Sequence, residues 1–245
     1  MKPEIIVVTA AYGRDRIGEL GGQQAVVPIV AAAGADGIEI RRELLSEAEI
    51  DHLAELGEAI ADADLAAFYS VPEALFTAQG ALNPNLEQHF NEAKQLHARL
   101  IKYSLGHYQR GIDSSPLRDK LAALPFQLVV ENDQTDCGTL AAIENYFYDE
   151  APVGMTFDMG NWLWVGDKPT QAAERLARFV SYVHVKAAVS AADGWRAIAL
   201  DDADNLWRET LALLPADVPR GIEFPLEGDD LVAVTRHYVD LLSEV

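Results

Sequence analysis

Short apolar runs alternate with longer amphipathic stretches along the whole chain. Most of the runs are rich in Val, Ile, Phe or Tyr and are too short for helices, which predicts β-strands. The predicted strands are Ile5–Thr9, Gly37–Arg41, Leu65–Ser70, Leu100–Leu105, Gln127–Glu131, Gly154–Asp158, Ser181–Lys186 and Gly221–Phe224.

The stretches between these runs carry apolar residues at helical spacing. Leu53, Leu56 and Ile60, for example, fall on one face of a helix. The clearest predicted helices are Ser46–Ala63, Asn83–Ala98, Asp201–Leu214 and Asp229–Leu242. The last two begin near an Asp that can cap them.

Strands that alternate with helices are expected to be parallel, and buried parallel strands read as continuous apolar runs. Eight such units in 245 residues predict an α/β fold, a (β/α)8 TIM barrel that forms one domain over residues 1–245. The alternative is an open doubly wound sheet, which usually shows a GxGxxG loop after its first strand. The glycines that follow the first predicted strand do not have that spacing.

Ionisable residues occupy the carboxyl ends of the last four predicted strands. They are Glu131, Asp158, His184 and Glu223. Because side chains alternate along a strand, Ile222 and Phe224 share one side and Glu223 takes the other. Val183 and Val185 leave His184 opposite in the same way. The charged members are therefore expected to point into the barrel near its active-site end.

Buried carboxylates repel one another, and a cation between them removes that penalty. Three carboxylates and an imidazole suit one divalent metal ion, Mn²⁺, Mg²⁺, Co²⁺ or Zn²⁺. Taken singly, a strand-end carboxylate is more often a helix cap, and a lone buried His is more often a core residue. A second alternative is that Lys186, on the side of His184, neutralises a metal-free cluster.

Charge and composition narrow the partners. The chain has 19 Lys and Arg against 39 Asp and Glu, a net charge of −20, which disfavours nucleic acid. Cys137 is the only cysteine, so no intrachain disulfide is possible, and no apolar stretch is long enough for a membrane span. The N-terminus does not have the pattern of a signal peptide, and we expect a cytoplasmic protein.

Five segments resemble the xylose isomerase-like barrel superfamily, in particular its sugar phosphate isomerase/epimerase group. They read GADGIEIR, VEN, FDMGNW, VHVK and GIEF and lie on predicted strands two and five to eight. The resemblance covers nearly the whole chain. It implies that Glu131, Asp158, His184 and Glu223 hold one metal, as in ketose 3-epimerases, and that Glu131 and Glu223 are the acid/base pair.

The activity so implied is isomerisation or epimerisation of a small sugar, sugar acid or sugar phosphate through an enediolate, without an organic cofactor. A metal-dependent dehydratase, such as an inosose or dehydroshikimate dehydratase, is the alternative on the same barrel. A non-catalytic sugar-binding protein is a further alternative. An endonuclease is disfavoured because that branch needs more histidines and a basic groove. Barrels of this group often pair, so a homodimer is expected.

The chain departs from the group where substrate would bind. Asn161 stands where many members have His, and Ala187 and Ala188 follow the strand-seven motif where many have Asp. The loop of residues 190–204 lacks the usual Gly-rich run. The remaining candidates for contact with substrate are Glu39, His107, Asn161, Trp162, Lys186 and Arg196. Glu39, His107, Trp162 and Lys186 also have alternative roles, such as a salt bridge from Glu39 to Arg41 or Arg42.

Overall fold

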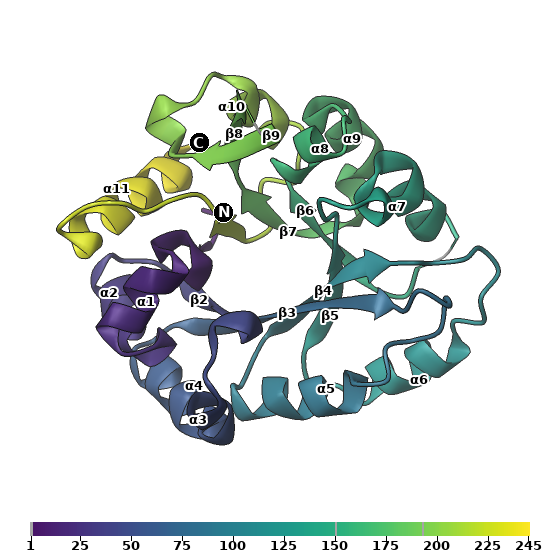
Figure 1. The fold of residues 1–245 in the computed structure, drawn as a ribbon, viewed down its shortest axis with the longest axis horizontal. Coiled ribbons are helices and arrows are strands. Elements are labelled where there is room, and N and C mark those ends of the chain that lie inside the picture. The colour runs from purple at the N-terminus through teal and green to yellow at the C-terminus, as the bar shows by residue number, and fades with distance from the viewer. Residues whose placement is uncertain (1, 150, 193) are drawn as a thin grey trace.

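Eight parallel strands close into a barrel, with helices packed around it (Figure 1). The computed structural model describes residues 2–149, 151–192 and 194–245. Around the barrel the strands follow the order β1-β10-β7-β6-β5-β4-β3-β2. The (β/α)8 barrel predicted from the alternating pattern is therefore confirmed, and the open sheet is not what forms.

The barrel strands are Ile5–Val8 (β1), Gly37–Arg41 (β2), Ala66–Phe76 (β3), Leu100–Gly106 (β4), Gln127–Glu131 (β5), Gly154–Asp158 (β6), Val180–Val185 (β7) and Arg220–Ile222 (β10). The helices are Arg14–Leu20 (α1), Val27–Ala32 (α2), Glu47–Asp51 (α3), Leu53–Asp62 (α4), Leu86–Gln95 (α5), Ser115–Ala122 (α6), Leu140–Phe147 (α7), Asn161–Trp164 (α8), Pro169–Leu176 (α9), Leu206–Leu211 (α10) and Leu231–Glu244 (α11). Figure 1 shows that the last helix, α11, closes the ring beside α1 and α2.

Two predicted helices differ from those observed. The stretch predicted as one helix over 46–63 is two, because the chain breaks at His52 between α3 and α4. Ser46 and Glu49 form a capping box that starts α3. The helix predicted over 201–214 is reduced to α10, whereas α11 begins after Asp230, whose side chain accepts from the backbone N–H of Ala233.

The segment after β7 contains a β-hairpin that the sequence pattern did not predict. Its antiparallel strands are Ala187–Ala191 (β8) and Gly194–Ile198 (β9). The first of them reads AAVSA and has no strong strand former except one Val, which explains why it was expected to be loop. Figure 1 places this hairpin at the edge of the barrel mouth, next to α10.

The interior of the barrel has an apolar layer near the amino ends of the strands. Its members are Ile6, Phe68, Leu100, Val129 and Tyr182. All five are buried, and the rings of Phe68 and Tyr182 pack edge to face with centroids 4.9 Å apart. A larger apolar core lies between the strands and the helices. Within the described residues, no helix is both long and apolar enough to cross a bilayer.

Candidate metal centre

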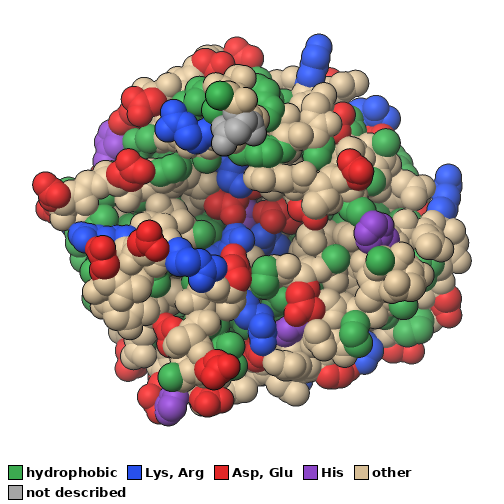
Figure 2. Space-filling view, in the orientation of Figure 1, with side chains coloured by type: hydrophobic (Ala, Val, Ile, Leu, Met, Phe, Trp, Pro, Cys, Tyr) green, Lys and Arg blue, Asp and Glu red, His purple; other side chains and the backbone are tan. Residues whose placement is uncertain are grey.

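The four ionisable strand-end groups converge at the carboxyl end of the barrel. Glu131 and Asp158 are the last residues of β5 and β6, His184 lies near the end of β7, and Glu223 directly follows β10. One ligand atom from each of the four lies within 4.8 Å of the others. Figure 2 shows acidic and basic side chains together in a hollow at the centre of this face. A groove of about 290 Å³ reaches Glu223 from outside.

Three of the four groups present buried atoms that make no hydrogen bond. They are Nδ1 of His184, Oε1 of Glu131 and Oε2 of Glu223. Nδ1 lies 2.6 Å from the Glu131 oxygen and 3.1 Å from the Glu223 oxygen, but not in a direction that makes a hydrogen bond to either. Buried polar atoms are rarely left without partners. One imidazole nitrogen and carboxylate oxygens turned toward the same point fit a divalent ion.

The other ring nitrogen of His184 fixes its orientation. Nε2 donates to Oε2 of Glu39 over 2.8 Å, and both side chains are almost fully buried. Glu39 belongs to β2, across the barrel from β7, so the contact spans the interior. A carboxylate on the outer nitrogen of a metal-binding histidine sets its tautomer and turns the free nitrogen toward the metal.

Three cations neutralise the carboxylates of the cluster. Lys102 on β4 contacts Oε2 of Glu131 at 2.5 Å, and Arg41 on β2 contacts Oε1 of Glu223 at 2.7 Å. Lys186 lies 2.7 Å from Oδ2 of Asp158 and 2.8 Å from Oε2 of Glu223. The carboxylates are therefore balanced by internal ammonium and guanidinium groups.

Asp158 is also held by hydrogen bonds from the backbone. Its Oδ1 accepts from the N–H groups of Gly160 and Asn161, each at 2.9 Å. The amide of Asn161 donates to the carbonyl of Asn132 and accepts from Lys186 at 3.2 Å. Asn161 thus lies beside the cluster and holds one of its members, Asp158, together with Lys186.

The surroundings shift the pKa values of Glu131 and Asp158 in opposite directions. Burial raises the pKa of Glu131, but Lys102 and then His184 outweigh it and bring the pKa down to about 2. For Asp158 burial dominates and raises the pKa to about 7, although Lys186 opposes it. Burial lowers the pKa of His184, yet the charges of Glu223, Glu39 and Glu131 together raise it well above the usual value.

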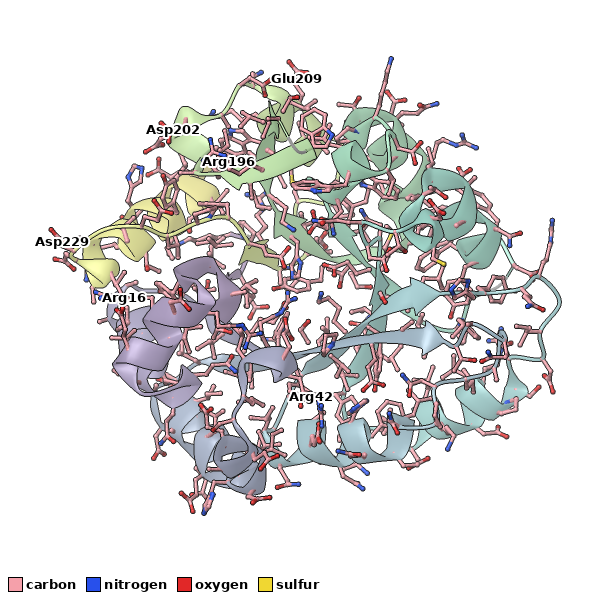
Figure 3. All side chains as sticks on the ribbon, viewed as in Figure 1. Arg16, Arg42, Arg196, Asp202, Glu209 and Asp229 are labelled. Carbon is pink, nitrogen blue, oxygen red and sulfur yellow. The ribbon has the colours of Figure 1, made fainter. Side chains whose placement is uncertain are left out.

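For three other candidate residues the structure shows contacts or positions outside the four-residue cluster. Trp162 is fully buried in the core, with its ring centroid 5.3 Å from that of Phe157. His107 is exposed after β4, with Nδ1 at 3.6 Å from the sulfur of Cys137. Arg196 is exposed on the β9 hairpin at the rim, as Figure 3 shows. Trp162 is therefore a core residue, and His107 and Arg196 are surface residues.

Two residues that touch the cluster were not among the predicted site residues. Lys102 follows Leu100 on the inward side of β4, so the alternation applied to the later strands would also have pointed it inward. Arg41 was considered only as a salt-bridge partner of Glu39, from which it lies 3.8 Å; its shorter contact is with Glu223. No pattern in the sequence joins the end of β2 to the residue after β10, a strand that is separated from β2 by β1.

Comparison with known proteins identifies the fold through structure and not through sequence. No protein-family model matches the chain, and no curated protein matches its sequence. A probable 3-DHS dehydratase, AsbF, from Bacillus anthracis superposes with a TM-score of 0.69 at 16% identity, over 98% of both chains. A xylose isomerase domain protein from Planctomyces limnophilus gives 0.69 at 14% identity, over 99% of this chain and 96% of that one.

An epimerase structure is also similar. D-psicose 3-epimerase, solved in the presence of D-fructose, superposes with a TM-score of 0.65 at 12% identity, over 97% of both chains. At these identities the likeness concerns the fold. The chain therefore shares the TIM-barrel fold of these structures, and a buried carboxylate and histidine cluster that could hold a metal lies at the carboxyl end of its barrel.

Proposed function

We propose that this protein is a metal-dependent isomerase or epimerase of a small sugar, sugar acid or sugar phosphate. The observation that carries the proposal is the convergence of Glu131, Asp158, His184 and Glu223, with three buried atoms that have no hydrogen-bond partner. Burying these charged groups costs desolvation energy, so the cluster contributes little to the stability of the fold. Clusters of buried ionisable groups in a cleft are instead typical of functional sites.

Glu131, Asp158, His184 and Glu223 would hold one divalent ion. When bound, such an ion makes a C–H next to a ligated substrate oxygen more acidic. The proposal includes Mn²⁺, Mg²⁺, Co²⁺ and Zn²⁺ alike, because oxygen and nitrogen ligands suit all four ions.

Glu131 and Glu223 would move the proton. Glu131 Oε1 and Glu223 Oε2, which make no hydrogen bond, flank Nδ1 of His184. The second oxygen of each carboxylate pairs with a cation, Lys102 for Glu131 and Arg41 for Glu223. One carboxylate removes the proton and leaves an enediolate. Return of a proton to the opposite face of the same carbon gives an epimer, and return to the neighbouring carbon gives an isomer.

Solvent deuterium tests this proposal directly. The Mn²⁺-loaded protein is incubated in D₂O with keto sugars, sugar acids and their phosphates, and each compound is examined by proton NMR. We expect one compound to lose a proton signal next to its carbonyl and to form an epimer or isomer. If no compound in the panel exchanges, the proposal fails.

A dehydratase is the second candidate. The structure that supports it is that of the probable 3-DHS dehydratase, which superposes over 98% of both chains. The same carboxylate would remove the proton, and a hydroxyl group would then leave from the next carbon, giving an enone. Ultraviolet absorbance of an enone product, without epimer formation, separates this reaction from the first.

A further inference from the structure

Lys186 bonds to two of the four candidate ligands at once. Its ammonium lies 2.7 Å from Oδ2 of Asp158 and 2.8 Å from Oε2 of Glu223. The Glu223 oxygen is the same atom that lies 3.1 Å from Nδ1 of His184. Because Oδ1 of Asp158 already accepts two backbone N–H groups, Oδ2 is the oxygen left for an ion, and the ammonium is bonded to it and to Oε2 of Glu223.

The fold makes room for this side chain. A Cβ added at Gly160 would lie 2.6 Å from Cγ and 2.7 Å from Cδ of Lys186. Gly160 has φ −81° and ψ −37°, an ordinary helical conformation that any residue can adopt. The missing side chain at 160 thus serves the lysine and not the backbone. Asn161 provides a third contact, because its Oδ1 accepts a hydrogen bond from the Lys186 ammonium at 3.2 Å.

Lys102 offers a contrast. It binds Glu131 through Oε2, whereas the Glu131 oxygen that faces His184 is Oε1. Lys102 and an ion would therefore use different oxygens of one carboxylate. Lys186 and an ion would use the same oxygens of two carboxylates.

We propose that Lys186 competes with the divalent ion for Asp158 and Glu223 and thereby sets the affinity of the site. The inference rests on the metal of the proposed function. Two cations that share the same two oxygens repel each other at close range in a buried setting. The ammonium must move away when the ion binds, so part of the ion's binding energy is spent on breaking two buried ion pairs.

The test is a calorimetric titration with Mn²⁺ of chelator-treated wild-type protein and three variants. Lys186→Met removes the competitor, and we expect its affinity for Mn²⁺ to rise at least about tenfold. Gly160→Ala keeps the charge but crowds the lysine stem, and we expect a smaller rise. Lys102→Met is the control, because it also removes a buried ammonium. It should tighten Mn²⁺ binding by less than about threefold.

A thermal measurement provides a second readout. Chelator-treated Lys186→Met removes the cation of Asp158 and leaves Glu223 with Arg41 alone, so it should melt below the wild-type protein. Saturating Mn²⁺ should then raise its melting temperature by more than it raises that of the wild type. If Lys186→Met fails to fold, Gly160→Ala still decides the question, because it retains the ammonium.

The outcomes separate this inference from the proposed function. Unchanged or weaker Mn²⁺ binding by Lys186→Met and Gly160→Ala, with one ion bound by the wild type, overturns the competition and leaves the function standing. Binding by Lys186→Met but not by the wild type supports the competition and contradicts a metal-dependent function. Binding by none of the proteins contradicts both.

Discussion

Two layers of buried side chains fill the same barrel, and one is apolar whereas the other is charged. The layer near the amino ends is apolar and tightly packed, and it includes Phe68, Leu100, Val129 and Tyr182. The layer two residues further along β4, β5 and β7 contains Lys102, Glu131 and His184. One step of the strand alternation thus separates a hydrophobic core from a cluster of buried charges. Stability is expected to reside in the first layer and chemistry in the second.

Removing the proposed proton carriers should give the largest effect on the charged layer. With the substrate that exchanges deuterium, Glu131→Gln and Glu223→Gln should each lower the exchange rate about 10²–10⁴-fold, because an amide cannot accept the proton. NMR exchange rates and circular dichroism together check this expectation. Wild-type rates in both variants would remove these carboxylates from the reaction.

Phe68→Ala should damage the apolar layer and spare the charged one. Phe68 is 1% exposed and packs against Tyr182, so its truncation should cost about 3–5 kcal/mol of unfolding free energy. Urea unfolding measures this loss, and Mn²⁺ titration of the folded variant should show an affinity within about tenfold of wild type. A variant of normal stability that no longer binds Mn²⁺ would erase the distinction between the layers.

The pH dependence of stability should carry the signature of the charged layer. Burial raises the pKa of Asp158 to about 7, and the carboxylates around His184 raise its pKa well above the usual value. Both groups then hold protons in the folded protein that the unfolded chain releases at lower pH. Stability is therefore lost as pH rises, through Asp158 from about pH 4 to 7 and through His184 above about pH 6.5.

We expect the unfolding free energy of chelator-treated protein to fall by on the order of 1–3 kcal/mol between pH 6.5 and 9. Saturating Mn²⁺ should flatten this fall, because the ion replaces the protons. Asp158→Asn should make the decline between pH 5 and 7 shallower. Stability that increases up to pH 9 in the chelated protein would show that these protons are not held as described.

Glu39→Ala should have a smaller effect than loss of the proton carriers, and it tests the role of β2. Loss of the hydrogen bond to Nε2 frees the His184 ring, and Mn²⁺ affinity should fall about 10–100-fold. Glu39→Gln should lose less, since its amide oxygen still accepts from the ring. Glu43→Ala is the control, because Glu43 pairs with Arg41. An equal loss in the control would mean that charge alone is responsible.

The sequence was sufficient for the barrel and for the four converging groups. The apolar runs marked each barrel strand within a few residues, except that β3 continues to Phe76, past a shift in its pairing with β4 between Ser70 and Ala74. Convergence followed from two local facts, the alternation of side chains and the common end of parallel strands. The first depends only on neighbours along one strand, and the second only on the strands being parallel.

The contacts between non-adjacent strands could not be predicted from side-chain alternation and parallel strand direction. Glu39 was a candidate for contact with substrate or for a salt bridge to Arg41 or Arg42, and its contact with His184 across the barrel was not predicted. Trp162 was considered as a wall for a sugar, but it faces the core, because α8 turns its ring toward Phe157. The identity of a partner on a non-adjacent strand depends on barrel diameter and stagger, which no short sequence pattern records.

The most direct measurement is a crystal structure of the Mn²⁺-soaked protein with data collected for anomalous scattering from manganese. The account predicts one anomalous peak at the barrel mouth, about 2.0–2.3 Å from oxygens of Glu131, Asp158 and Glu223 and from Nδ1 of His184. A fully soaked crystal with no peak among these four groups, and with Lys186 still bonded to Asp158 and Glu223, would contradict it.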